Sequence, residues 1–236
     1  MQTATPTMPS TIIGISSMAT RQLLAELVAA YRQTVDCAIA IESVGGVDAA
    51  KRVQAGEPFD VVFLASDAID KLMAAGLIDA QSKVDLVDSG VAVAVRAGAA
   101  QPDISSEEAV RQAVLAARSL SYSTGPSGVA LAKLFERWGI ADAIASRIVQ
   151  APPGVPVGSL VAKGEVALGF QQLSELIHLE GITVVGPLPA AIQITTTFSA
   201  GVCTGSPQAQ AVRDLLAFMG SAQTAEVKRH QGMEPA

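Results

Sequence analysis

The stretch ESVGGVDAA, residues 42–50, joins an apolar run to a helical pattern. It follows CAIAI (37–41), and the segment from Val47 to about Ala55 has the spacing of an amphipathic helix. A strand that ends in a serine and two glycines directly before a helix leaves the N–H groups of the first helical turn free. Such a turn favours an anion. The same strand–turn–helix order recurs along the chain and predicts an α/β fold.

The composition is that of a globular chain. Of its 236 residues, 50% are hydrophobic and 16% are charged, and this length accommodates two lobes or one large domain. The formal net charge of −6 argues against a general binder of nucleic acid backbones. Cys37 and Cys203 lie in apolar runs and are expected to be buried free thiols. We expect no metal site and no cofactor.

The first ten residues, MQTATPTMPS, carry no positive charge, and the apolar run TIIGI (11–15) is too short for a signal peptide. No run of about 20 apolar residues occurs, so no membrane span is expected. These features predict a cytoplasmic protein. A periplasmic location is the alternative if a leader has been removed.

Short apolar strands alternate with helical patterns along most of the chain, which predicts parallel strands with helices on both faces. Ser66 is expected to cap one helix and Gly76 to end it. Strands are expected at 11–15, 37–43, 60–65, 84–98, 120–123, 147–151, 166–170 and 191–204. Helices are expected at 18–33, 47–55, 66–76, 105–117, 129–139, 156–164, 171–181, 207–221 and 221–232.

Two long β segments, near 84–96 and 191–203, bracket a self-contained α/β stretch. This pattern predicts two lobes joined by a two-strand hinge, each lobe a mixed, mostly parallel sheet flanked by helices. The expected lobe I comprises residues 1–85 plus 195–236, and the expected lobe II comprises 86–194. A ligand is expected between them, at the carboxyl ends of the strands.

Four expected strand-to-helix turns are rich in small polar residues. Each offers a hydroxyl or an amide together with helix N-terminal N–H groups. Simple N-capping explains any single turn, but four at matching places predict a cradle for an oxyanion or a carboxylate. The turns are GISSMAT (14–20), ESVGG (42–46), STGPSG (123–128) and GFQQLS (169–174).

Arg21 lies in the first turn of a helix, where the dipole disfavours a cation. It is a candidate for a bidentate contact with a substrate carboxylate. The alternatives are an exposed arginine or an ion pair with Glu26. Arg52 and Arg96 are expected to form surface or hinge ion pairs.

Near the end of an expected helix, His178 is interpreted as a surface residue, with a catalytic role as the weaker alternative. Phe135 and Trp138 are expected to pack their helix onto its lobe. The chain contains no G-x-S-x-G elbow, no P-loop and no G-x-G-x-x-G motif, so these motifs indicate neither a serine hydrolase nor a nucleotide.

Four segments together resemble the molybdate-binding family of type II periplasmic binding proteins, over nearly the whole chain. Two patterns carry the resemblance: GG-x-x-x-A-x-x-x-x-x-G-x-x-x-DV, which begins at Gly45, and GE-x-x-x-G, which begins at Gly164. The resemblance implies two α/β lobes that close over an oxyanion. The segments are GISSMATRQLLAELVAAYRQ, ESVGGVDAAKRVQAGEPFDVVFLAS, STGPSGVALAKLFERWGI and KGEVALGFQQLSEL.

Members of that family hold molybdate with serines in the first two turns and a tyrosine after the GE-x-x-x-G strand. Ser17 or its neighbour Ser16 matches the first serine. Val47 stands at the second position, and Gln171–Gln172 stand where the tyrosine would be. These departures favour another anion. A branch of the superfamily, which contains bacterial aconitate isomerase, moves a double bond in a tricarboxylate by proton transfer.

Two functions therefore remain open. One is a cytosolic isomerase of a small unsaturated di- or tricarboxylate, and the other is a non-catalytic binding protein, of the ABC-transporter type, for a carboxylate or a molybdate-like oxyanion. The base is not identified; Glu42, Asp48 and His178 are candidates by type. The partner is a small anion in either case, and the oligomeric state is open. The expected ligand-binding residues are Ser16, Ser17, Arg21, Ser43, Gly45, Gly46, Thr124, Ser127, Gly128, Gln171 and Gln172.

Overall fold

The computed structural model describes residues 11–152 and 154–236. The strands are β1 Ile12–Ser17, β2 Ile39–Val44, β3 Val61–Ala65, β4 Val84–Arg96, β5 Leu120–Tyr122, β6 Leu168–Gln172, β7 Ile182–Pro187, β8 Thr195–Val202 and β9 Glu234–Pro235. The α-helices are α1 Arg21–Tyr31, α2 Gly46–Gln54, α3 Ser66–Ala74, α4 Glu107–Ala116, α5 Pro126–Arg137, α6 Ala141–Ile144, α7 Val157–Lys163, α8 Leu173–Leu176, α9 Ala209–Gly220 and α10 Ala225–His230. Short 3-10 helices are η1 Met18–Thr20, η2 Ala145–Arg147, η3 Ala190–Ile192 and η4 Ala222–Thr224.

The strands of the described residues form one mixed sheet. Its order is β2-β1-β3-β8-β4-β6-β5, and β7 and β9 also pair with β4. Three pairs are parallel, β1–β2, β1–β3 and β5–β6. Every pair that involves β4 or β8 is antiparallel. The expectation of mostly parallel pairing is therefore wrong, because the chain leaves along β4 and returns along β8, and these two strands pair with most of the others.

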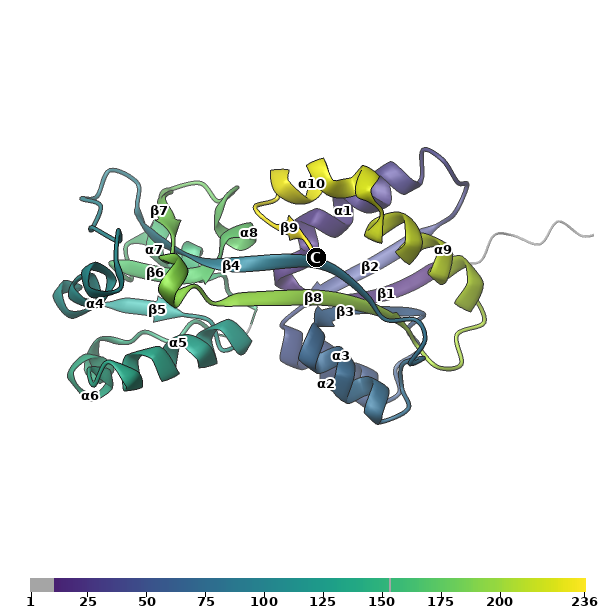
Figure 1. Ribbon diagram of the computed structural model, residues 1–236, viewed down its shortest axis with the longest axis horizontal. Coiled ribbons are helices and arrows are strands. Elements are labelled where there is room, and N and C mark those ends of the chain that lie inside the picture. The colour runs from purple at the N-terminus through teal and green to yellow at the C-terminus, as the bar shows by residue number, and fades with distance from the viewer. Residues whose placement is uncertain (1–10, 153) are drawn as a thin grey trace, which may run out of the picture.

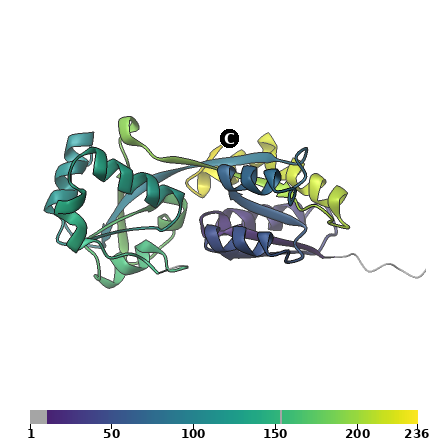
Figure 2. The ribbon, with the colours of Figure 1, turned by 90° about the horizontal axis from the view of Figure 1, so that it is seen from below.

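Two groups of elements lie at opposite ends of β4 and β8 (Figures 1 and 2). The terminal group contains β1–β3, α1–α3, α9 and α10, and the central group contains α4–α8 and β5–β7. Each has its own apolar core, one around Leu23 and Phe63 and the other around Phe135 and Phe170. Trp138 packs beside Phe135, as expected. The lobe boundaries inferred from the sequence stay a prediction.

The two long strands are tied to each other by side chains. Thr197 Oγ1 donates to Asp88 at 2.6 Å, and Ser199 Oγ donates to Asp85 at 2.6 Å. At Gly90 the Gln193 amide approaches so closely that an added Cβ would lie 3.1 Å from its nitrogen. β4 continues through the polar residues 88–90, as the expected long strand requires, and the missing side chain of Gly90 makes room for Gln193.

Several sequence expectations differ from the structure in detail. Residues 147–151 form no strand, and only Ile148 makes a bridge, to Leu120. Ser66 is the first residue of α3 rather than its cap, since Ala65 occupies that position. Gly76 follows the helix with a φ of 74°, as expected of a helix stop.

Both cysteines are free thiols. Cys203 is buried, and desolvation raises the pKa of its thiol to about 12. Cys37 is only half-buried, because it precedes the edge strand β2. Across residues 11–152 and 154–236, none of the helices combines the length and the apolar character needed to cross a membrane.

Candidate functional site

The two serines that end β1 face opposite sides of the sheet, because side chains alternate along a strand. Ser16 is fully buried, and its Oγ shares a hydrogen bond of 2.7 Å with Ser43 Oγ on β2. Ser17 is 6% exposed, and among the described residues its Oγ has no hydrogen-bond partner. A Cβ at Gly46 would lie 3.5 Å from Ser17 Cβ. Ser17 thus places an unused hydroxyl beside the first residue of α2.

The N-terminus of α2 is open. Gly45 is the N-cap and has no side chain to cap the helix, and within the described residues no side chain is recorded as accepting from the N–H groups of the first turn. Since these groups have no intrahelical acceptor, they and the helix dipole favour a negative charge. Val47, which follows Gly46, is 51% exposed.

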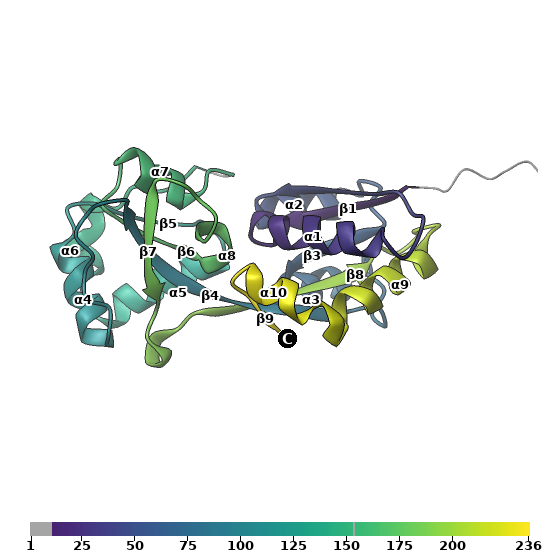
Figure 3. The ribbon, with the colours of Figure 1, turned by 90° about the horizontal axis from the view of Figure 1, so that it is seen from above.

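The turns after β1 and β6 meet although they are far apart in sequence. Ser174 Oγ, on α8, donates a hydrogen bond of 3.0 Å to the carbonyl oxygen of Ala19 in η1. A Cβ at Gly232 would lie 2.9 Å from Leu173 Cγ, so the turn after α10 also packs on α8. Figure 3 shows α8 facing α10 at the boundary between the two groups. We call residues 16–20, 171–175 and 228–233 together the junction.

Gln172 links the junction to the long strands. It is 4% exposed, and its amide lies 3.0 Å from Thr196 Oγ1 on β8. Both atoms of the Gln172 side-chain amide have hydrogen-bond partners when the oxygen accepts from Thr196 Oγ1 and the nitrogen donates to Ser89 Oγ, on β4, at 2.9 Å. Gln172 therefore holds the end of β6 against both connecting strands.

Lys228 contributes a buried cation to the junction. The residue is 2% exposed, and no hydrogen bond or ion pair holds its ammonium group within the described residues. Burial lowers its pKa. Its carbonyl oxygen accepts from Met233 N–H at 3.1 Å, and Met233 shares a core cluster with Ala19. The ammonium nitrogen is not one of the fully sealed atoms, so it keeps some contact with solvent. A cation that is desolvated this far is favoured when an anion accompanies it.

Glu175 contributes a carboxyl with an unusual environment. Gln171 Nε2 donates to Glu175 Oε2 at 2.7 Å, and Gly158 N–H, at the start of α7, donates to Gln171 Oε1 at 3.2 Å. Desolvation raises the pKa of Glu175 to about 7, although the Gln171 hydrogen bond acts against this shift. Sequence reasoning missed Glu175, since SELIHLEG indicates only a helix with an acidic surface residue.

The turn STGPSG follows β5, which pairs in parallel with β6, so it leaves the same edge of the sheet as the turn after β6. No hydrogen bond joins it to the other three turns within the described chain. Ser123 Oγ and Ser127 Oγ lie 3.3 Å apart, and Thr124 is exposed. A Cβ at Gly128 would collide with the Ser123 carbonyl oxygen, so this close turn requires glycine. No side chain caps α5, whose N-cap is Gly125. This turn provides a second open helix N-terminus, in the central group.

Arg21 lies away from the junction contacts. It is exposed and lines a hollow of about 390 Å³ between α1 and β2, together with Ser43 and apolar side chains. The alternative pair with Glu26 is not formed, since Glu26 accepts from Gln231 at 2.7 Å and lies 3.7 Å from His230. A ligand contact by Arg21 stays a prediction.

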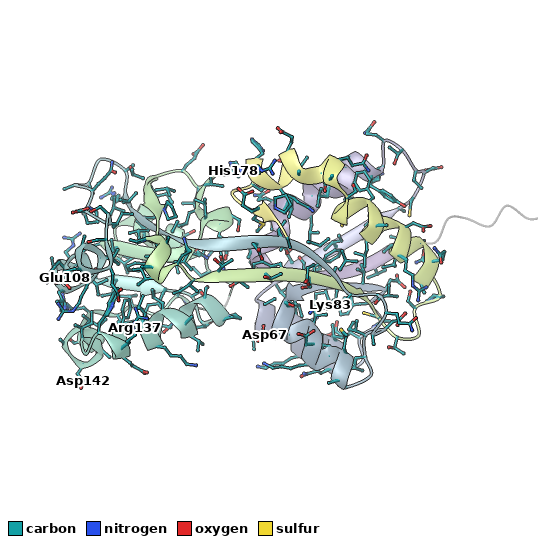
Figure 4. All side chains as sticks on the ribbon, viewed as in Figure 1. Asp67, Lys83, Glu108, Arg137, Asp142 and His178 are labelled. Carbon is teal, nitrogen blue, oxygen red and sulfur yellow. The ribbon has the colours of Figure 1, made fainter. Side chains whose placement is uncertain are left out.

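The three bases considered from sequence are exposed. Glu42 pairs with Arg52 at 2.8 Å, which lowers the pKa of the carboxyl and confirms the surface ion pair of Arg52. Asp48 lies in the first turn of α2. His178 follows α8 and lies beside α10, its ring 5.5 Å from that of His230 (Figure 4). All three are more exposed than Glu175, which is half-buried.

One further expectation is corrected. Arg96 was expected to form an ion pair, but it has none within the described residues. It lines a surface hollow of about 510 Å³ with Arg118, at the end of β4 remote from β9.

Solved structures identify the fold. The periplasmic molybdate-binding protein of Azotobacter vinelandii superposes with a TM-score of 0.78 at 19% identity, covering 94% of this chain and 98% of that one. The sulfate-binding protein SubI of Mycobacterium tuberculosis gives a TM-score of 0.78 at 16% identity, covering 96% and 87%. The chain therefore has the α/β fold of periplasmic binding proteins, similar to molybdate-binding members.

The family model for bacterial extracellular solute-binding proteins matches residues 13–234, and the chain belongs to this family. A curated relative, aconitate isomerase from a Pseudomonas species, is 40% identical over 185 residues. This match covers 78% of the present chain and 70% of the relative.

Proposed function

We propose that this protein is an isomerase that shifts a double bond in a small unsaturated di- or tricarboxylate of the aconitate type. The observation that carries the proposal is the 40% identity to aconitate isomerase over 185 residues. This similarity is far greater than the identities of 14–19% to the structures of molybdate- and sulfate-binding proteins. At such low identity, the similarity to the molybdate- and sulfate-binding proteins supports a shared fold but not a shared ligand.

The junction supports an anionic substrate with more than one carboxylate. Ser17 Oγ and the open end of α2 offer uncharged donors, and Lys228 offers a positive charge without an acidic partner. When the carbon next to a carboxylate loses a proton, the negative charge that develops is shared with that carboxylate. Donors already in place stabilise this charge without reorganisation.

The proposed site lies between two lobes, formed by the terminal and central groups with β4 and β8 as the hinge. Closure would bring the start of α5, with Thr124, Ser127 and Gly128, towards the start of α2. Both helix ends would then face one ligand. Gln171 and Gln172 would hold the end of β6 in place through their existing hydrogen bonds.

The second candidate function is non-catalytic binding of a small anion. The match to a family described as solute-binding proteins supports it. The same donors serve a receptor equally well. The two functions differ in whether a group at the site moves a proton.

Proton NMR of the protein with cis- and trans-aconitate tests the proposal. We expect interconversion of the two isomers until their ratio no longer depends on the starting compound. Citrate and molybdate are the control ligands. Line broadening of the aconitate signals without interconversion would support a non-catalytic carboxylate-binding protein. Binding of molybdate but not of aconitate would support an oxyanion-binding protein.

A further inference from the structure

Glu175 differs from the other acidic side chains in its partners. Glu42, Asp79 and Glu107 each pair with an arginine, and these contacts help to lower their pKa values. Glu175 has Gln171 as its hydrogen-bond partner and no basic neighbour that shifts its pKa. It is the one carboxyl of the described residues whose pKa is clearly raised. Near neutral pH it can therefore both accept and release a proton.

One carboxyl oxygen of Glu175 is available. The hydrogen bond from Gln171 engages Oε2, and no partner engages Oε1 within the described residues. Among the described residues, the fully buried side-chain atoms without a partner are Ser17 Oγ, Ser121 Oγ and Gln231 Oε1. Glu175 Oε1 is not one of them, so it keeps contact with solvent. A proton-transfer group needs such an accessible oxygen.

The carboxyl is also fixed in place. Gln171 is 4% exposed and is itself held by Gly158 N–H, so its amide is oriented before any ligand arrives. The residue before Glu175, Ser174, binds the Ala19 carbonyl oxygen. Glu175 thus lies next in sequence to the contact between α8 and η1, and η1 begins directly after Ser17.

We infer that Glu175 is the catalytic residue that takes a proton from the substrate and returns it, and that Gln171 is a positioning residue for its carboxyl. This inference rests on the proposed isomerase function. It names a base that none of the sequence candidates supplied.

The step is a 1,3-shift of one proton. Glu175 Oε1 takes the proton from the methylene carbon next to a carboxylate, and the C–H electron pair forms the new double bond. The pair of the old double bond moves to its far carbon, which takes the proton back from Glu175. The enzyme and the atom count of the substrate are unchanged, and no oxidant or second reactant takes part.

The test compares Glu175→Gln with a matched control, Glu180→Gln, which changes an exposed carboxylate four residues after α8. Glutamine keeps the size and a hydrogen-bonding oxygen but cannot accept the proton. We expect kcat to fall by about 10²- to 10⁴-fold in Glu175→Gln, while calorimetric affinity for trans-aconitate stays within a few-fold. Glu180→Gln should keep the wild-type kcat.

A conservative variant and a pH profile separate a proton carrier from a structural residue. Glu175→Asp should recover part of the lost rate, and wild-type kcat should rise with pH as a single carboxyl near pH 7 ionises. Glu175→Gln should lose this dependence.

Two results have different meanings. Wild-type activity that survives in Glu175→Gln, with the same pH profile, would overturn the role of Glu175 and leave the isomerase intact. Aconitate binding without any turnover by the wild type would overturn both the isomerase and the base.

Discussion

The two sides of the junction carry opposite chemistry. The terminal side, with Ser17 and Lys228, holds a hydroxyl and a cation that find no partner in the part of the chain that the structure describes. The central side, with Gln171 and Glu175, holds a hydrogen-bonded acid whose pKa is near neutrality. Unpartnered donors suit a ligand that brings negative charge, whereas an oriented acid suits the movement of a proton. Under the proposed function, the unpartnered donors of the terminal side contact the substrate, and the central side adds the proton-transfer carboxyl to the open end of α5.

The largest effect on binding is expected from Lys228→Met. Loss of a charge-assisted contact should weaken binding of trans-aconitate by about 100-fold, which corresponds to about 3 kcal/mol. The same variant should unfold at a higher temperature, because it removes an unpaired buried cation. Calorimetry gives the affinity and thermal unfolding gives the stability.

Lys163→Met is the control for Lys228→Met, since Lys163 is an exposed residue at the end of α7. It should change neither quantity. If Lys228→Met left the affinity for trans-aconitate unchanged, Lys228 would not be a ligand contact of the terminal side.

Ser17→Ala and Ser16→Ala test the two faces of β1. Ser17→Ala should weaken binding by about tenfold, and it should stabilise the free protein by about 1 kcal/mol because it removes a buried, unpaired hydroxyl. Ser16→Ala should instead lower stability by about 1 kcal/mol, since Ser43 loses its partner. Titration with trans-aconitate and urea unfolding measure both effects. Equal changes in affinity and stability in the two variants would mean that the direction in which each serine points from β1 does not determine which one contacts the ligand.

Gln171→Met tests whether Gln171, on the central side, controls the pKa of Glu175. The Gln171 hydrogen bond lowers the pKa of Glu175, so its loss should raise that pKa further. The rise of kcat with pH should move to higher pH, and the rate at pH 6 should fall several-fold. A profile identical to that of the wild type would show that Gln171 does not control the carboxyl.

The smallest effect is on stability. The pKa of Glu175 is about 7 when folded, against an ordinary value of 4.5. The folded state therefore favours the neutral acid, and the wild type should lose stability as pH rises from about 4.5 through 7. Glu175→Gln removes this loss, so its advantage in Tm over the wild type should be greater at pH 8 than at pH 5. A constant difference between the two proteins would contradict the raised pKa.

The fold was largely readable from the sequence because several strands and helices in both groups have clear periods. β1, β3, α4 and α5 lie close to their expected positions, and Ser106 caps α4 by accepting from Ala109 N–H. The misses have physical reasons. Residues 182–187 form β7 although they are only partly buried, and β9 has two residues, so neither has a strong apolar signal.

The site was less readable, because its chemistry depends on packing. Ser17 and Gly46 could be selected from turn patterns, and they do lie together. Lys228 is part of KRH at a helix end, which indicates an exposed basic turn, yet Lys228 is buried. The raised pKa of Glu175 comes from neighbours that the sequence does not place beside it.

The most direct measurement is the uptake of solvent deuterium into trans-aconitate, followed by NMR in D2O with the wild type and Glu175→Gln side by side. The account predicts deuterium at the methylene carbon with the wild type and a loss of at least 100-fold in rate with the variant. Aconitate that binds to the wild type but neither gains deuterium nor converts to the other isomer would contradict proton transfer at the junction.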